Sequence, residues 1–120
     1  MASGRIPIKY EWEIELFETS RGEKPVEDFI RSMESGSIAK IAHAIDLLKQ
    51  HGSLLGMPHA KKVTNQLYEL RIRGKQEIRI LYAFSYRMIY LLHGFKKKQD
   101  KIPSKELHTA EVRLSYLTKI

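Results

Sequence analysis

The sequence predicts an α+β fold with the element order βααβββα, in which two N-terminal helices pack a small antiparallel sheet and a C-terminal helix follows it. Two observations support this class. Apolar and polar residues alternate near the N-terminus and in two later segments, which is the period of half-buried strands, and a third later segment is apolar on both faces. Apolar residues recur at helical spacing in two segments after the first strand and in one at the C-terminus.

The N-terminal third predicts one strand and one helix. The strand is expected over residues 6–16, where every even position is apolar. Pro25 stands where a helix can begin, because its fixed backbone angle suits the first helical position. Apolar residues then follow at helical spacing until Gly36, which we expect to end this helix.

A second helix and a loop are expected next. Ser37 is predicted to cap this helix, which should end at Gly52. Residues 53–65 contain Gly56 and Pro58 without clear periodicity, so they are expected to form a loop. The apolar face of the second helix should consist of Ile38, Ile41, Ala42, Ile45 and Leu48.

Residues 67–73, 77–84 and 87–95 predict three successive strands of an antiparallel meander, broken by Gly74 and by a turn at residues 85–86. The last of these strands is apolar on both faces, which favours an interior position in the sheet. Pro103 should open the final helix. Its apolar stripe consists of Leu107, Ala110, Leu114 and Leu117.

Length and composition indicate one folded domain over residues 1–120, because 42% of the residues are apolar and 29% are charged. The formal charge of +7 favours a polyanionic partner, with nucleic acid as the first candidate. The absence of cysteine excludes disulfides and thiol chemistry and agrees with a cytoplasmic location. We expect no membrane partner, since no apolar run is long enough to cross a bilayer.

The predicted hairpin of residues 67–84 carries charges on its polar face. A loop of three residues, Gly74 to Gln76, keeps the apolar sets together and should pair Arg71 with Arg79. Two opposed arginines repel by roughly a few tenths of a kcal/mol unless an acid or an anion lies between them. Either Glu69 or solvent screens this pair, or the arginines form a seat for phosphate.

Three consecutive lysines, Lys96 to Lys98, follow the last strand, and at least one should share a face with the arginines. Such a run is often only a solvated strand end. His93 is either packed and hydrogen-bonded or a proton carrier, since imidazole titrates near neutral pH. We expect Tyr82 in the core, whereas Phe95 either packs or stacks on RNA bases.

Metal and cofactor sites are not expected. The five histidines include no pair spaced for a metal on one helix face. The chain also has no glycine-rich phosphate loop and no arrangement that specifically suggests a catalytic triad.

The second half of the chain resembles the phage-derived Gp49-like branch of HigB toxins, in the RelE/ParE superfamily. The residues that carry this resemblance are Leu67–Arg71, Ile78–Phe84, Leu91–Lys98 and Ile102–Pro103, in this order. Pro25–Phe29 and Gly52–Pro58 are similar to the family's first-helix start and loop. The resemblance therefore covers nearly the whole chain.

The resemblance implies a RelE-like fold and the toxin of a type II toxin-antitoxin system. Such a toxin is a metal-independent endoribonuclease that cuts messenger RNA, usually on the translating ribosome, and thereby inhibits translation and growth. The implied partner is a HigA-like helix-turn-helix antitoxin that blocks the toxin. Operator DNA would be reached only through that antitoxin.

RNA cleavage of this kind uses the 2′-hydroxyl of the substrate, so the protein must position the backbone, remove a proton and neutralise a more negative phosphate. Arginine suits phosphate binding because its fork makes two bonds and stays charged. The catalytic residues expected are Arg73, Arg79, Lys96, Lys97 and His93, with the last three as alternative proton carriers. The RNA-binding residues expected are Arg71, Lys61, Lys62, Lys98 and Phe95.

We expect Arg79 to point its charge outward from the sheet and therefore to be dispensable for stability.

Two other functions remain open. One is a ParE-like gyrase inhibitor, because a shared fold does not fix function. The other is a basic RNA-binding module that touches phosphate without cleaving it.

Overall fold

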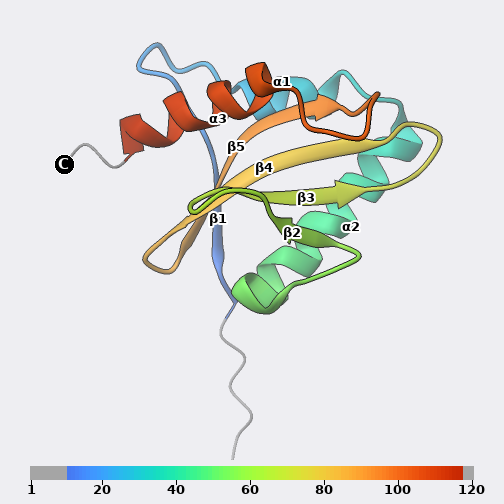
Figure 1. The fold of residues 1–120 in the computed structure, drawn as a ribbon, viewed down its shortest axis with the longest axis horizontal. Helices are drawn as coiled ribbons and strands as arrows, with labels where there is room; N and C mark the ends of the chain where they lie inside the picture. The colour runs from blue at the N-terminus through green and yellow to red at the C-terminus, as the bar shows by residue number, and fades with distance from the viewer. Residues whose placement is uncertain (1–10, 118–120) are drawn as a thin grey trace, which may run out of the picture.

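The computed structural model describes residues 11–117 and confirms the predicted α+β class. Three helices accompany one five-stranded sheet (Figure 1). A short 3₁₀ turn, η1 (Gly52–Leu54), follows the second helix. The strands and helices in chain order are β1 (Glu13–Leu16), α1 (Pro25–Arg31), α2 (Ser35–His51), β2 (Ala60–Lys62), β3 (Tyr68–Ile72), β4 (Ile78–Ser85), β5 (Met88–Lys96) and α3 (Ser104–Leu117).

The sheet has the strand order β1-β5-β4-β3-β2. The antiparallel meander of β3, β4 and β5 is confirmed, and β5 lies in the interior of the sheet as expected. The prediction of a wholly antiparallel sheet is wrong, since β1 pairs in parallel with β5. A hairpin forces antiparallel pairing only on consecutive strands, whereas two helices and three strands separate β1 from β5 in the chain.

Two further strand predictions change. Residues 53–65 are not all loop, because Ala60–Lys62 pairs with β3 as the edge strand β2. Three residues are too few to show a period in the sequence. Within the described chain the first strand is Glu13–Leu16, so residues 11 and 12 of the predicted strand lie before it. Residues 6–10 of that prediction lie outside the described residues.

Three helices form where the sequence predicts them, but the predicted end of the first helix is wrong. The helix α1 ends at Arg31, with Ser32 as its C-cap, and Gly36 lies in the first turn of α2. Two details of α2 are also wrong. The helix starts at Ser35 with Glu34 before it, so Ser37 lies inside the first turn instead of capping it. Ala42 is exposed and Ala44 is buried in its place, because the buried stripe follows Ile41, Ala44 and Leu48. Among residues 11–117, no helix is both long and apolar enough to cross a membrane.

The sheet has an apolar core on each face. On one face, α1 and α2 contribute Val26, Ile41 and Leu48 to a cluster with the predicted inward residues of β3 and β4. On the other face, α3 places Ala110 and Leu114 against Leu81, Ala83 and other residues of β4 and β5. Figure 1 shows α3 crossing the sheet apart from α2. The strand β4 is therefore covered on both sides, and Tyr82 is buried as expected.

Gly94 lets α1 approach β5 closely. A Cβ atom at this position would lie 2.5 Å from Cδ2 of Phe29, which is closer than packed atoms allow. The missing side chain therefore sets how near Phe29 sits to the second half of β5.

Gly94→Ala should lower the free energy of unfolding by about 1–3 kcal/mol, because the added methyl group overpacks the contact with Phe29. Urea unfolding followed by circular dichroism measures the change. The matched control is Gly36→Ala, where no atom lies within 4 Å, and it should leave stability unchanged or raise it by up to about 1 kcal/mol. Equal stability of Gly94→Ala and the native chain would contradict the close packing of α1 on β5.

Candidate functional site

The register of the sheet brings two basic segments to one end of the molecule. Arg71 lies opposite Arg79, as predicted, and Arg79 lies opposite Phe95 on the next strand. The turn after β3 and the exit of β5 therefore meet. Residues 71–79 carry four basic side chains and residues 96–105 carry five, against one acidic residue in each segment.

Arg79 is buried at this end of the sheet, with 2% of its surface exposed. Its Nη2 donates a hydrogen bond to Glu77 Oε1 at 2.9 Å, and its Nη1 donates to the carbonyl of Ile78 at 3.0 Å. Its Nε lies 3.5 Å from Oε2 of Glu69, a carboxylate that is also buried. The expectation of an outward, exposed charge is wrong, because two carboxylates and a carbonyl surround the guanidinium.

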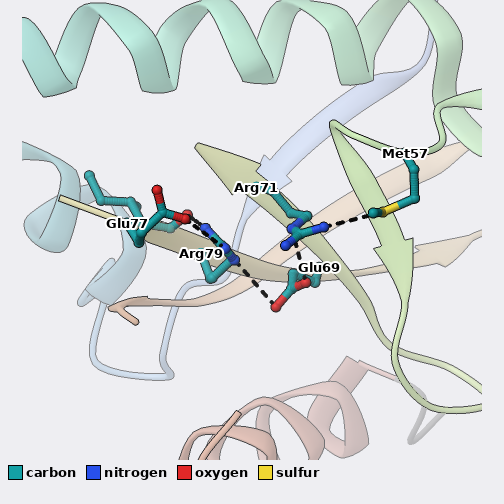
Figure 2. Close-up of polar contacts among 6 residues, drawn as sticks. Met57, Glu69, Arg71, Glu77 and Arg79 are labelled. Atoms are coloured by element: carbon teal, nitrogen blue, oxygen red, sulfur yellow. Dashed lines mark hydrogen bonds and ion pairs between the residues drawn. The ribbon is translucent and has the colours of Figure 1, made fainter. Parts of the chain in front are cut away.

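Glu69 lies between the two arginines. Its Oε1 is 3.6 Å from Nε of Arg71, and its Oε2 faces Arg79. Figure 2 shows the side chains in a row from Glu77 through Arg79 and Glu69 to Arg71, which reaches the sulfur of Met57. Of the two interpretations of the arginine pair, the structure supports screening by Glu69. Arg71 keeps 12% of its side chain exposed.

Glu77 is the solvent-facing member of this row, with 41% of its side chain exposed. The hydrogen bond from Arg79 lowers the pKa of the Glu77 carboxyl below its ordinary value of 4.5, and the charges of Arg79 and Arg73 act in the same direction. Arg73 itself is exposed. The charge of Arg73 therefore acts on Glu77 beyond Ile72 and Ile78, the last ladder pair of the hairpin.

The two lysines of β2, Lys61 and Lys62, point to opposite faces of the sheet. Lys61 lies opposite Glu69 in the ladder of β2 and β3, while Lys62 lies opposite Tyr68. Successive residues of a strand point to opposite faces, and Nζ of Lys62 sits 5.9 Å from the centre of the Tyr68 ring. Only Lys61 therefore shares a sheet face with Glu69 and the two arginines.

A hollow of about 540 Å³ opens beside the exit of β5. The strand β1 pairs only with Met88–Leu91, so within residues 11–117 the second half of β5 has a strand neighbour on one side. Three lysines from β5, the following loop and α3 converge here with one aromatic ring from α1. The lining residues are Phe29, Lys96, Lys98, Gln99, Pro103, Lys105 and Glu106, which we call the lysine hollow.

Glu106 and His93 form a hydrogen-bonded pair at this hollow. The Nε2 atom of His93 lies 2.7 Å from Oε1 of Glu106, and Glu106 lines the hollow. On the other side of the ring, Nη1 of Arg113 lies 3.4 Å from Nδ1 of His93 and donates to the carbonyl of Leu92. Burial lowers the pKa of Arg113. The imidazole is thus held between a carboxylate and a guanidinium, and its carboxylate partner faces solvent-accessible space.

Sequence reasoning did not identify Glu106. It lies 13 residues after His93, on a different element, and nothing in its spacing marks it.

Phe95 is 5% exposed and packs in the core beneath α3, so of its two predicted roles the structure supports packing. Lys97 is half-buried, and its backbone N–H donates to the carbonyl of Glu77. Across residues 11–117, no three His, Asp or Glu side chains gather where they could hold a metal ion.

Comparison with known proteins gives one family match. The family model described as "Phage derived protein Gp49-like (DUF891)" matches residues 28–115 of the chain. This range includes the side chains from Glu69 to Arg79 described above, the whole lysine hollow and the pair of His93 with Glu106. Among curated proteins, no match is found.

Arg79→Met should lower the free energy of unfolding by about 3–5 kcal/mol, because it leaves the buried carboxylate of Glu69 without its nearest cation. Urea unfolding measures the loss. The matched control, Arg31→Met, removes an exposed ion pair with Glu27 and should cost less than about 1 kcal/mol. If both variants lose the same small amount, Arg79 has no structural role.

Glu77→Gln should destabilise the chain at neutral pH and have no effect in acid. Because the folded pKa of Glu77 is lowered, its ionised form stabilises the native state above pH 4.5, and this contribution is lost as the pH falls through the folded value. Unfolding curves of both chains between pH 7 and pH 2 test this. A stability difference that grows on acidification would contradict the assigned contact with Arg79.

Proposed function

Because the chain belongs to the phage-derived Gp49-like family, which is associated with toxin–antitoxin modules, we propose that it is a type II toxin that cleaves messenger RNA. The cut would fall on the translating ribosome and would inhibit translation and growth. The observation that carries this proposal is a carboxylate, Glu106, in a hollow with three lysines. A carboxylate among cations pairs a proton acceptor with a binding surface for RNA phosphates.

The lysine hollow supports a site for the RNA backbone. Lys96, Lys98 and Lys105 supply positive charge from two elements and the loop between them, and exposed lysines bind phosphate as point charges. Phe29 adds an apolar ring, on which an unstacked base can pack. This combination of lysines with one aromatic ring is typical of single-stranded RNA contacts.

The reaction needs no group beyond the chain, the RNA and water. The 2′-oxygen of one nucleotide attacks the adjacent phosphorus, and the bond from phosphorus to the 5′-oxygen breaks. The departing 5′-oxygen takes a proton from water, which leaves a 2′,3′-cyclic phosphate and a 5′-hydroxyl. Glu106 accepts the proton of the 2′-hydroxyl. His93, which is hydrogen-bonded to Glu106, orients that carboxylate and shares the proton that Glu106 takes up. The lysines stabilise the extra negative charge on the phosphate.

The remaining predicted residues either bind phosphate, support the binding surface or have no part in this proposal. Arg73 is exposed and Arg71 is partly exposed, so both extend the phosphate-binding surface across the sheet end, with Lys61 on the same face. Arg79 is a positioning residue, since its contacts with Glu69 and Glu77 hold this surface in place. Lys97 supports the surface through its backbone contact with Glu77. Lys62 and Phe95 have no part in it.

The proposed partners follow from the same role. A toxin needs a cognate antitoxin, here a HigA-like helix-turn-helix protein, and the substrate is messenger RNA on the ribosome. The positive end of the molecule favours approach to the polyanionic ribosome. Operator DNA would be contacted by the antitoxin.

Glu106→Gln should slow RNA cleavage by about 10²–10⁴-fold, because it removes the proposed proton acceptor and keeps the shape of the side chain. RNA binding should weaken little, since the lysines remain. The readouts are gel cleavage of a message with translating ribosomes, RNA affinity and growth on induction. Glu111→Gln, an exposed residue of the same helix, is the control and should cleave like the native chain.

Three outcomes would contradict the proposal. Full cleavage by Glu106→Gln would remove Glu106 from the mechanism. Salt-dependent RNA binding by a native chain that never cuts and never slows growth would indicate a binding module. Growth arrest with intact messages and failed supercoiling would indicate a gyrase inhibitor.

A further inference from the structure

A second hollow, of about 430 Å³, lies between α2 and the end of β3. We call it the α2–β3 groove. It is separate from the lysine hollow, since the two have no lining residue in common. The side chains of Ala44, Leu47, Pro58 and Ile72 give it a mainly aliphatic lining. An aliphatic surface of this kind gains free energy when an apolar partner removes it from water.

The other lining residues make the groove cationic. Lys40, His43, His59 and Arg73 are exposed, and Arg71 is partly exposed. Among the described residues that line the groove, none is acidic and none is Phe, Tyr or Trp. The groove therefore offers cations and two imidazole rings around an aliphatic floor, without the larger rings of Phe, Tyr or Trp.

This chemistry suits an acidic peptide segment with aliphatic side chains. Aliphatic side chains fill the floor, and carboxylates bind the surrounding cations, above all the two arginines, whose N–H groups can donate to both oxygens of one carboxylate. RNA would satisfy the cations but would leave the aliphatic floor without a partner. Charge and apolar surface together therefore favour a protein segment over RNA at this position.

We propose that the α2–β3 groove binds an acidic, aliphatic segment of the partner antitoxin. The inference rests on the proposed toxin function and says how the toxin is silenced. Carboxylates of the segment occupy Arg71 and Arg73, which the RNA backbone otherwise needs. The antitoxin then competes with RNA at the sheet end without covering Glu106 in the lysine hollow.

The test uses a fluorescent synthetic peptide of about 15 residues with Leu at every third or fourth position and Glu between, the pattern of an amphipathic helix. Two control peptides carry Lys in place of Glu and Ser in place of Leu. The chain is tested as Lys40→Glu with His43→Glu, and as Lys49→Glu with Gln50→Glu. Both pairs lie on α2 and change the charge equally, but only the first lines the groove.

The Leu/Glu peptide should bind the native chain, and neither control peptide should. The groove variant should lose at least roughly tenfold in affinity, while the matched variant stays within about twofold. In the native chain, amide shifts should fall on residues 39–47, on His59 and on residues 71–73. The peptide should also inhibit RNA cleavage by the native chain and by the matched variant, and should fail to inhibit the groove variant.

No binding of the Leu/Glu peptide, equal binding to both variants, or amide shifts elsewhere would overturn the inference. Loss of RNA binding in the groove variant but not in the charge-matched variant would overturn it as well, since Lys40 and His43 would then belong to the nucleic-acid surface. Because peptide binding is read directly, its failure is separate from failure of the ribonuclease proposal. A chain that binds the peptide in the groove and never cuts RNA contradicts only the ribonuclease.

Discussion

The ladder between β4 and β5 is the constraint from which the rest of this molecule follows. Its register pairs Ile78 with Lys96 and so joins the turn after β3 to the exit of β5. A bulge at Leu81 and Tyr82 shifts this register by one residue, and His93 then pairs with Leu81 on the face that α3 covers. Without that shift, His93 would turn away from Glu106.

The buried Arg79 and its partners hold together the end of the sheet beside the exposed basic surface. A buried guanidinium is costly unless its charge and its hydrogen bonds find partners. Glu77 and the carbonyl of Ile78 accept hydrogen bonds from Arg79, and Glu69 places a second negative charge 3.5 Å from Nε, which donates no hydrogen bond within the described residues. These contacts tie β3 to the start of β4 at the point where the two basic segments meet. The exposed cations around them are therefore carried on a rigid sheet end, which suits a binding surface.

Much of this arrangement could be predicted from the sequence, because it follows from short-range periodicity. The three helices, the β3–β5 meander and the opposition of Arg71 to Arg79 all follow from alternation and one loop length. The buried state of Arg79 could not be predicted, since strand parity does not reveal what covers the polar face. That face is covered because α3 returns across it, and only a contact between distant elements shows this.

The candidate site could be predicted only where it consists of residues close together in the sequence. The lysines after β5 are visible as a run in the sequence, but their convergence with Phe29 and Lys105 depends on how α1 and α3 pack around the end of β5. Glu106 meets His93 through tertiary packing alone. The α2–β3 groove joins residues from α2, the loop before β2 and β3, which no local pattern connects.

The most direct test of the central claim is the chemistry of the RNA ends formed when the purified chain is added to a message on translating ribosomes. The account predicts new internal 5′-hydroxyl ends, each matched by a 2′,3′-cyclic phosphate on the upstream fragment. A message that stays intact, or fragments that carry 5′-phosphates, would contradict cleavage by the 2′-hydroxyl at the lysine hollow.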